Sequence, residues 1–128
     1  MENRPKTVLV IDDDEMVRES VRACLEHEGF QVAVVEEVAK VWDAIRAVEP
    51  DLVIMDMYMP ETDGRVILRE MKKNPDTAKI PVVFLTGSTE AVDVYTGLDA
   101  GAVEYFAKPF VGEDLAAKIR TILKMNAR

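Results

Sequence analysis

The chain has 128 residues, of which 48% are hydrophobic and 31% charged, and its length and composition suit a single globular domain with one core. Lys and Arg number 16 against 24 Asp and Glu, and the resulting net charge of -8 argues against direct binding to nucleic acid, because an acidic chain repels phosphate backbones. The single cysteine, Cys24, excludes an internal disulfide, and no apolar run has the length of a membrane span or the form of a signal peptide.

We therefore expect one cytoplasmic domain over residues 1–128, with its core at about 7–123, a short tail at 1–6 and no membrane partner.

Two hydrophobic periods alternate along the chain. Apolar runs bounded by turn residues indicate strands, and apolar residues at helical spacing indicate helices. In chain order they predict strand 8–11, helix 17–25, strand 32–35, helix 38–48, strand 52–55, helix 66–71, strand 82–85, helix 88–98, strand 103–106 and helix 115–123. The strands at 8–11, 52–55 and 82–85 are continuous apolar runs, whereas those at 32–35 and 103–106 have weaker patterns. Five such β-α units predict a five-stranded parallel sheet with helices on both faces, the flavodoxin-like, doubly wound α/β sandwich.

The fourth predicted helix has an unusual composition. Gly97 costs about 0.8–1.0 kcal/mol relative to Ala, so this segment is a poor helix former. We expect Tyr95 and Leu98 to face the core and Val94 to point outward. There Val94, together with Tyr105, would contribute to a surface for a partner.

Polar residues follow four of the predicted strands, and because the carboxyl ends of parallel strands share one edge of a sheet, we expect them to lie together. These residues are Asp12, Asp13, Asp14, Asp56, Thr86 and Lys108. Two unit charges 4 Å apart repel by about 4 kcal/mol at an effective dielectric constant of 20, so the clustered carboxylates need protons or a cation. Oxygen ligands without a nearby His or Cys favour Mg²⁺, with Mn²⁺ as a substitute. Asp14 has a simpler role as the N-cap of the first helix.

Lys108 and Thr86 complete a set of groups suited to phosphoryl transfer. The Lys108 ammonium would face the carboxylates, the Thr86 hydroxyl would donate to a phosphoryl oxygen, and Gly87 leaves the approach open. In such a site Asp56 is the best candidate for the nucleophile. Simpler roles stay open, since Lys108 could be a surface lysine and Thr86 a helix cap.

Four stretches of the chain together resemble the receiver domain of two-component response regulators, from about Thr7 to Leu123. They are V-L-V-I-D-D-D at 8–14, D-L-V-I-M-D-M-Y-M-P-E-T-D-G at 51–64, P-V-V-F-L-T-G at 81–87 and G-A-V-E-Y-F-A-K-P-F at 101–110. The resemblance implies that Asp56 accepts a phosphoryl group from a phosphohistidine on a sensor histidine kinase or phosphotransfer protein. It also implies a domain that assists only its own phosphorylation and dephosphorylation and is otherwise no enzyme.

The same resemblance implies roles for the residues around Asp56. Asp13 and Asp56 would bind Mg²⁺ directly, together with the backbone carbonyl of Tyr58, and Asp12 would act mainly through a water. Thr86 and Lys108 would hold the phosphoryl oxygens.

Turn residues shape the loops at this edge. Pro60 stiffens the loop after Asp56, and Asp63-Gly64 is a turn that opens the third helix. By resemblance, the bond between Lys108 and Pro109 is cis.

The resemblance further implies a switch. Thr86 would move toward the phosphate and Tyr105 would turn inward. The surface of the fourth helix, fifth strand and fifth helix would then change its affinity for an output domain, an effector protein or a second copy in a phosphorylation-linked dimer. A half-buried strand aromatic explains Tyr105 equally well.

Tyr58 and Ser88 occupy the variable positions that flank the site in this family. Neither carries a carboxylate or amide that would orient a water, so we expect slower autodephosphorylation than with Glu or Gln at position 88. Thr62 also departs from the family, which has an apolar residue there.

Three alternative functions stay open. A receiver-like docking module would never be phosphorylated. A flavodoxin-like electron carrier would need a phosphate-binding loop after the first strand, where the aspartates at 12–14 repel a flavin phosphate. A phosphatase of the haloacid dehalogenase type would need a second Asp two residues after its nucleophile, where this chain has Tyr58.

Overall fold

The computed structural model describes residues 5–88 and 90–125, so most of the predicted tail lies outside the described residues. Five strands alternate with five α-helices over these ranges, and a 3-10 turn at Val38–Lys40 precedes the second helix. In chain order the elements are β1 (Thr7–Ile11), α1 (Glu15–His27), β2 (Gln31–Val35), α2 (Val41–Val48), β3 (Leu52–Met55), α3 (Gly64–Lys73), β4 (Val82–Thr86), α4 (Ala91–Asp99), β5 (Glu104–Ala107) and α5 (Gly112–Met125).

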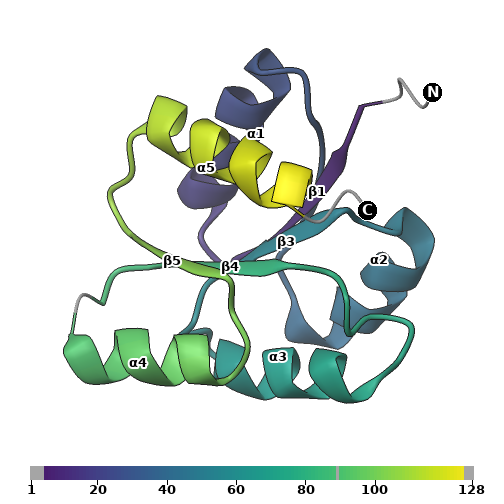
Figure 1. Ribbon diagram of the computed structural model, residues 1–128, viewed down its shortest axis with the longest axis vertical. Coiled ribbons are helices and arrows are strands. Elements are labelled where there is room, and N and C mark those ends of the chain that lie inside the picture. The colour runs from purple at the N-terminus through teal and green to yellow at the C-terminus, as the bar shows by residue number, and fades with distance from the viewer. Residues whose placement is uncertain (1–4, 89, 126–128) are drawn as a thin grey trace.

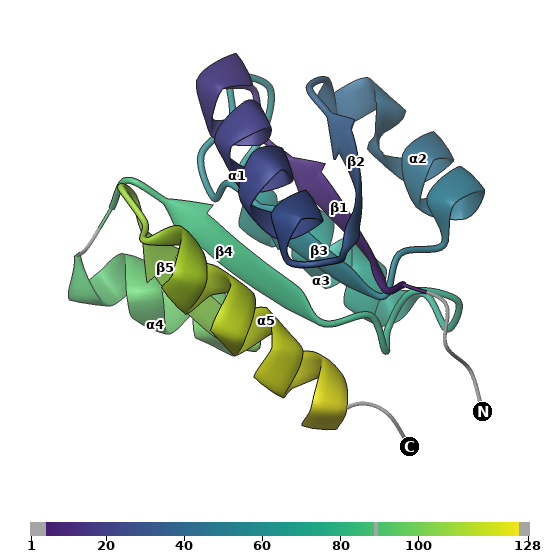
Figure 2. The ribbon, with the colours of Figure 1, turned by 90° about the horizontal axis from the view of Figure 1, so that it is seen from above.

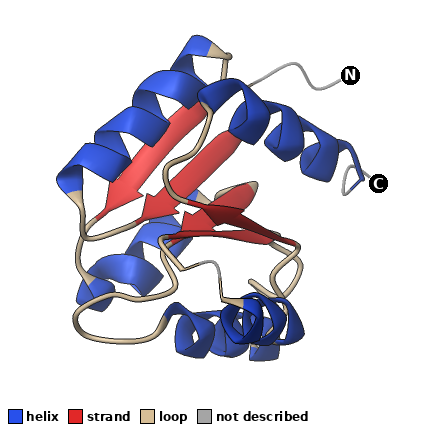
Figure 3. Ribbon diagram, turned by 90° about the vertical axis from the view of Figure 1, so that its left-hand side faces the viewer, coloured by secondary structure: helices blue, strands red, loops and turns tan. Residues whose placement is uncertain are grey.

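The strands form one parallel sheet in the order β2-β1-β3-β4-β5, which confirms the flavodoxin-like fold. Helices α1 and α5 lie on one face of the sheet, and α2, α3 and α4 lie on the other (Figure 1). Figure 3 shows the strands enclosed between these helical layers. The chain runs from β1 to the β2 edge and then returns through β3 toward β5, so the reversal of strand order lies between β1 and β3, where such folds bind ligands.

Because helices cover both faces of the sheet, the central strands are apolar throughout. Alternate residues of β1 enter different cores: Val8 and Val10 pack with α1 and α5, whereas Leu9 and Ile11 pack with α2 and α3. A strand buried on both sides therefore has no polar face, and its pattern is a continuous apolar run. Among the described residues, no helix combines the length and apolar character needed to cross a membrane.

Helix α4 differs from the sequence-based expectation in its start and in its orientation. It begins at Ala91 rather than at 88, and residue 89 lies outside the described residues. Tyr95 is 66% exposed and Leu98 43% exposed, so the expectation that they face the core was wrong. Val94 is half-buried rather than fully outward.

The physical reason for this orientation is the close packing of Gly97. A Cβ atom at this position would lie 2.8 Å from Met57 Cε and 3.2 Å from the Phe84 ring. The residue that weakens the helix is thus the one that lets α4 approach the sheet, and the larger side chains on other sides of the helix point outward (Figure 2 shows α4 alongside β4 and β5).

The start of α3 also approaches the sheet closely, at Gly64. A Cβ atom there would lie 2.6 Å from the backbone oxygen of Asp56 and 3.0 Å from the Phe84 ring. The Gly64 amide donates to the Met57 carbonyl at 2.6 Å, and the Asp63 side chain caps the helix by accepting from the Arg65 amide. Only glycine fits here without moving the backbone at Asp56.

We predict that Gly64→Ala lowers the free energy of unfolding by about 1–3 kcal/mol, because the backbone around Asp56 must shift. Denaturant unfolding measures this loss. Gly87→Ala is the matched control: a Cβ atom there meets nothing within 4 Å. Equal losses in the two variants would contradict the steric argument.

Candidate functional site

The register of β1 and β3 places Asp12 beside Asp56. Ile11 lies opposite Met55, and the Asp56 amide donates to the Ile11 carbonyl at 3.0 Å. Asp12 is 2% exposed and Asp56 8%, whereas Asp13 is exposed to solvent. Each of the three aspartates offers a carboxylate oxygen within 4.8 Å of the others. The predicted convergence of these carboxylates is confirmed.

Lys108 reaches the carboxylates from the end of β5. Its ammonium lies 3.1 Å from Asp12 Oδ2 and 3.2 Å from Asp56 Oδ2. The Lys108 amide donates to the Thr86 carbonyl at 2.8 Å, which joins the ends of β4 and β5. The bond between Lys108 and Pro109 is cis, as expected. The simpler reading of Lys108 as a surface lysine is therefore wrong.

The buried charges shift one another's protonation. Burial raises the pKa of Asp12, an effect that hydrogen bonds from the Asp14 amide and from Lys108 only partly offset. For Lys108, burial lowers the pKa, but the hydrogen bond to Asp12 and the charges of Asp12 and Asp56 outweigh it, so the pKa is raised overall. The ammonium therefore stays protonated and offers its charge to both buried carboxylates.

The donor set fits a hard divalent cation. Asp12, Asp13 and Asp56 supply only oxygen ligands, and three carboxylates at this separation suit an ion such as Mg²⁺ that keeps some of its waters. The Tyr58 amide donates to Asp56 Oδ1 at 3.2 Å, so the chain segment with the expected carbonyl ligand lies beside the cluster. Asp14 has the capping role predicted for it, accepting from the Met16 amide at 2.9 Å.

Two other expected site residues lie on the neighbouring strands. Thr86 is buried at the end of β4, opposite Ala107 of β5, and the exposed Gly87 follows it. Tyr105 is half-buried, and its hydroxyl donates to the Ser88 backbone carbonyl at 2.7 Å. The Tyr105 side chain therefore contacts the loop that leaves Thr86.

Two groups of residues near the site were not predicted. Arg18 is buried on α1, and its guanidinium donates to the Asp12 backbone carbonyl at 2.8 Å. On α4, Asp93 accepts hydrogen bonds from the hydroxyls of Tyr58 and Ser88, each at 2.6 Å. An arginine at the spacing of the buried face of α1 was a usable signal, whereas Asp93 resembles any acidic residue in the first turn of a helix.

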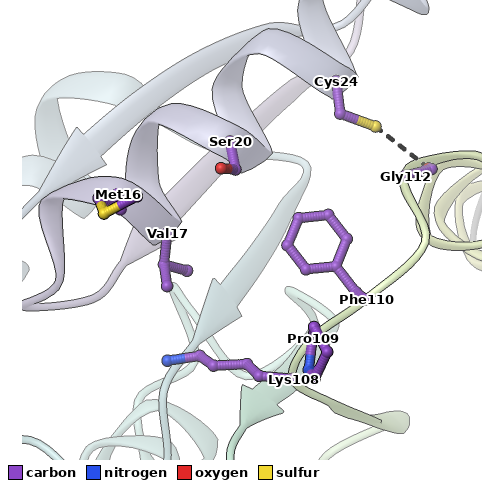
Figure 4. Close-up of a pocket in the computed structure, with 8 residues that line it drawn as sticks. All are labelled: Met16, Val17, Ser20, Cys24, Lys108, Pro109, Phe110 and Gly112. Carbon is purple, nitrogen blue, oxygen red and sulfur yellow. Dashed lines mark hydrogen bonds between the residues drawn. The ribbon is translucent and has the colours of Figure 1, made fainter.

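A cavity of about 550 Å³ adjoins the Lys108 side of the site, between α1 and the segment that joins β5 to α5. Figure 4 shows Lys108 at one end and Cys24 near Gly112 at the other. Cys24 Sγ donates to the Gly112 carbonyl at 3.1 Å, and burial raises the pKa of this thiol. The residues that line the cavity are mainly apolar and do not include the three aspartates, so we treat it as separate from the polar site.

Residues 8–120 match the family model described as the response regulator receiver domain. The chain belongs to this family. A receiver domain is a signalling module and not an enzyme in the usual sense. Membership in this family argues against two of the alternative functions, the flavodoxin-like electron carrier and the haloacid dehalogenase-type phosphatase.

Curated relatives of this receiver domain are longer proteins. It is 35% identical over 126 residues to the DNA-binding response regulator MtrA of Mycobacterium tuberculosis, covering 98% of this chain and 54% of MtrA. It is 37% identical over 120 residues to the response regulator MprA of Mycolicibacterium vanbaalenii, covering 94% of this chain and 51% of MprA. The chain thus spans about half the length of these relatives.

Solved structures agree with the family assignment. A putative response regulator from Chloroflexus aurantiacus superposes with a TM-score of 0.89 at 30% identity, covering 94% of this chain and 98% of that one. The signal receiver domain of a signal transduction histidine kinase from Syntrophus aciditrophicus gives 0.86 at 31% identity, covering 96% and 93%.

We predict that Asp12→Asn raises the melting temperature of the metal-free receiver domain at pH 7, by roughly 4 °C for each kcal/mol gained. Because burial raises the pKa of Asp12, its neutral form favours folding. The associated stability is fully present below the ordinary pKa of 3.8 and is lost as the pH rises through the raised value.

Thermal melts in a chelating buffer from pH 3 to pH 7 test this, since asparagine stays neutral throughout and the gap between the two proteins should close toward low pH. A lower melting temperature for Asp12→Asn at pH 7 would show that the Lys108 ion pair outweighs the cost of burying the charge.

Proposed function

We propose that this receiver domain accepts a phosphoryl group on Asp56 from the phosphohistidine of a sensor histidine kinase or phosphotransfer protein. The observation that carries the proposal is the position of Asp56: its carboxylate lies next to that of Asp12 and 3.2 Å from the Lys108 ammonium. A nucleophile, a cation and candidate metal ligands thus meet at the carboxyl edge of the sheet.

The proposed transfer uses each of these groups. An Asp56 oxygen bonds to phosphorus in line with the departing imidazole nitrogen, and the electron pair of the broken P–N bond stays on the imidazole. Lys108 donates to a phosphoryl oxygen as charge builds there, and Thr86 donates its hydroxyl to another. Gly87 has no side chain to obstruct the donor.

Mg²⁺ held by Asp12, Asp13, Asp56 and the Tyr58 backbone carbonyl would supply positive charge to the phosphoryl oxygens. In this proposal Asp12 acts mainly through a bound water. Mn²⁺ has the same preference for oxygen ligands and would substitute.

Loop residues hold this arrangement in place. Pro60 restricts the loop after Asp56, and Gly64 lets α3 start against the Asp56 backbone. Pro109 follows Lys108 directly and restricts the chain where the ammonium leaves β5.

The proposed output is a change in the surface formed by α4, β5 and α5. Movement of Thr86 toward the phosphoryl group would displace Ser88, whose carbonyl accepts from the Tyr105 hydroxyl. Tyr105 would then move, changing a surface that includes Val94 and the exposed Tyr95.

The binding partner of this surface would be an output domain, an effector protein or a second copy of the receiver domain in a phosphorylation-linked dimer. The relative MtrA is named a DNA-binding response regulator, and in such a protein a separate domain would contact DNA. We place this signalling in the cytoplasm, and the net charge of -8 argues against nucleic-acid binding by the receiver domain itself.

Asp56→Asn should abolish phosphorylation. Incubation with a small-molecule phosphodonor and Mg²⁺ should add one phosphoryl group to the wild type and none to the variant, as read by intact mass. The exposed Asp76, remote from the acid cluster in sequence, supplies a control: Asp76→Asn should be modified like the wild type. An unmodified wild type would favour the docking module, and modification of Asp56→Asn would mean another acceptor.

Ser88→Glu should shorten the lifetime of the aspartyl phosphate by at least about threefold, the value of one well-placed hydrogen bond. A carboxylate at this position can orient a water toward phosphorus. The serine hydroxyl does not do so, because it donates its hydrogen bond to Asp93. The decay of phosphorylated protein after removal of the donor measures the effect. A lifetime equal to that of the wild type would refute the expectation.

A further inference from the structure

Asp93 on α4 joins the two loops that flank the phosphoacceptor pocket. One carboxylate oxygen accepts from the Tyr58 hydroxyl, in the loop after β3, and the other accepts from the Ser88 hydroxyl, in the loop after β4. Both distances are 2.6 Å, typical of strong hydrogen bonds to a charged acceptor. These bonds occupy the hydroxyl protons of both flanking residues.

Arg65 of α3 also contacts this carboxylate, at the same oxygen that accepts from the Tyr58 hydroxyl. Its guanidinium lies 3.6 Å from Asp93, stacks 5.3 Å from the centre of the Tyr58 ring and donates to Thr96 of α4. A bidentate contact with Asp63 holds the guanidinium itself in place. The side chains of Arg65 and Asp93 are each only 16% exposed, and α3 and α4 lie next to each other in Figure 1.

The protonation state of Asp93 suits an acceptor. The hydrogen bonds from Ser88 and Tyr58, in that order of effect, hold its pKa below the ordinary value, so the carboxylate is ionised at neutral pH. An ionised carboxylate can only accept hydrogen bonds, and here each oxygen accepts one hydroxyl.

The two hydroxyls belong to residues next to the reacting groups. The Tyr58 amide donates to Asp56 Oδ1 at 3.2 Å, and Ser88 is two residues beyond Thr86. Released from Asp93, the Ser88 hydroxyl could turn toward a water near Asp56 by rotation of its side chain. The Tyr58 hydroxyl oxygen still accepts from Arg65 at 3.3 Å, but its proton becomes free to point toward such a water.

We infer that Asp93 is a positioning residue that slows hydrolysis of the aspartyl phosphate, an inference that rests on the proposed function of Asp56. In this hydrolysis a water oxygen bonds to phosphorus, and the bond between phosphorus and the Asp56 oxygen breaks. The electron pair returns to the Asp56 carboxylate, and the proton lost by the water passes to solvent. By holding the Tyr58 and Ser88 hydroxyls against α4, Asp93 keeps both from orienting that water.

The decay of phosphorylated protein after removal of a small-molecule phosphodonor tests the inference. Asp93→Ala should decay about threefold to tenfold faster than the wild type, the range expected for gaining one neutral hydrogen bond to the water. Asp93→Asn keeps one acceptor oxygen and should show a smaller acceleration. Asp99→Asn, an exposed position on the same helix, should decay at the wild-type rate.

A second background separates positioning from loosening of the fold. In the double variant Tyr58→Phe/Ser88→Ala no hydroxyl remains to be released, so adding Asp93→Ala should leave the decay rate unchanged. A purely structural effect of Asp93 would accelerate decay in both backgrounds. Thermal melts of every variant confirm that the protein is folded at the temperature of the assay.

The outcomes distinguish the two proposals. If the wild type takes up no phosphoryl group on Asp56, the proposed function and this inference both fail. If the wild type is phosphorylated but Asp93→Ala decays at the wild-type rate, or accelerates equally in the double variant, only the inference is overturned.

Discussion

The balance of charge at the carboxyl edge of the sheet is the constraint on which the rest of the structure depends. The carboxylates of Asp12 and Asp56 are buried beside each other. Burying two adjacent negative charges costs free energy unless a cation lies close enough to compensate them. Lys108 supplies that cation at 3.1 and 3.2 Å, and it can do so because the strands are parallel, which puts the end of β5 at the same edge of the sheet as the ends of β1 and β3. The fold therefore assembles a site that no single segment contains.

Much of this arrangement could be predicted from the chain because strict physical rules govern it. Strands covered on both faces must be apolar throughout, so three of the five strands were visible as continuous runs. Parallel strands end at one edge, so the residues after each run, among them Asp12, Asp56 and Lys108, had to converge there. The prediction needed only the order of the elements and no knowledge of side-chain packing.

Other features depend on packing and were out of reach or missed. The outward position of Tyr95 follows from the contact of Gly97 with Met57 and Phe84, because a short helix with a weak apolar face does not itself define which side packs. The contact of Asp93 with Tyr58 joins residues 35 positions apart in the chain, and nothing local signals it. Arg18 was also missed, although its spacing from Val21 and Leu25 on the buried face of α1 was a signal that could have indicated a buried cation.

The most direct test of Asp56 as the phosphoacceptor is to identify the modified residue chemically. Borohydride reduces an aspartyl acyl phosphate to homoserine, which tandem mass spectrometry locates to one residue. After treatment of the wild-type domain with a phosphodonor and Mg²⁺, we expect homoserine at position 56 and at no other aspartate. Homoserine at Asp12 or Asp13, or a stable phosphate that resists reduction, would contradict it.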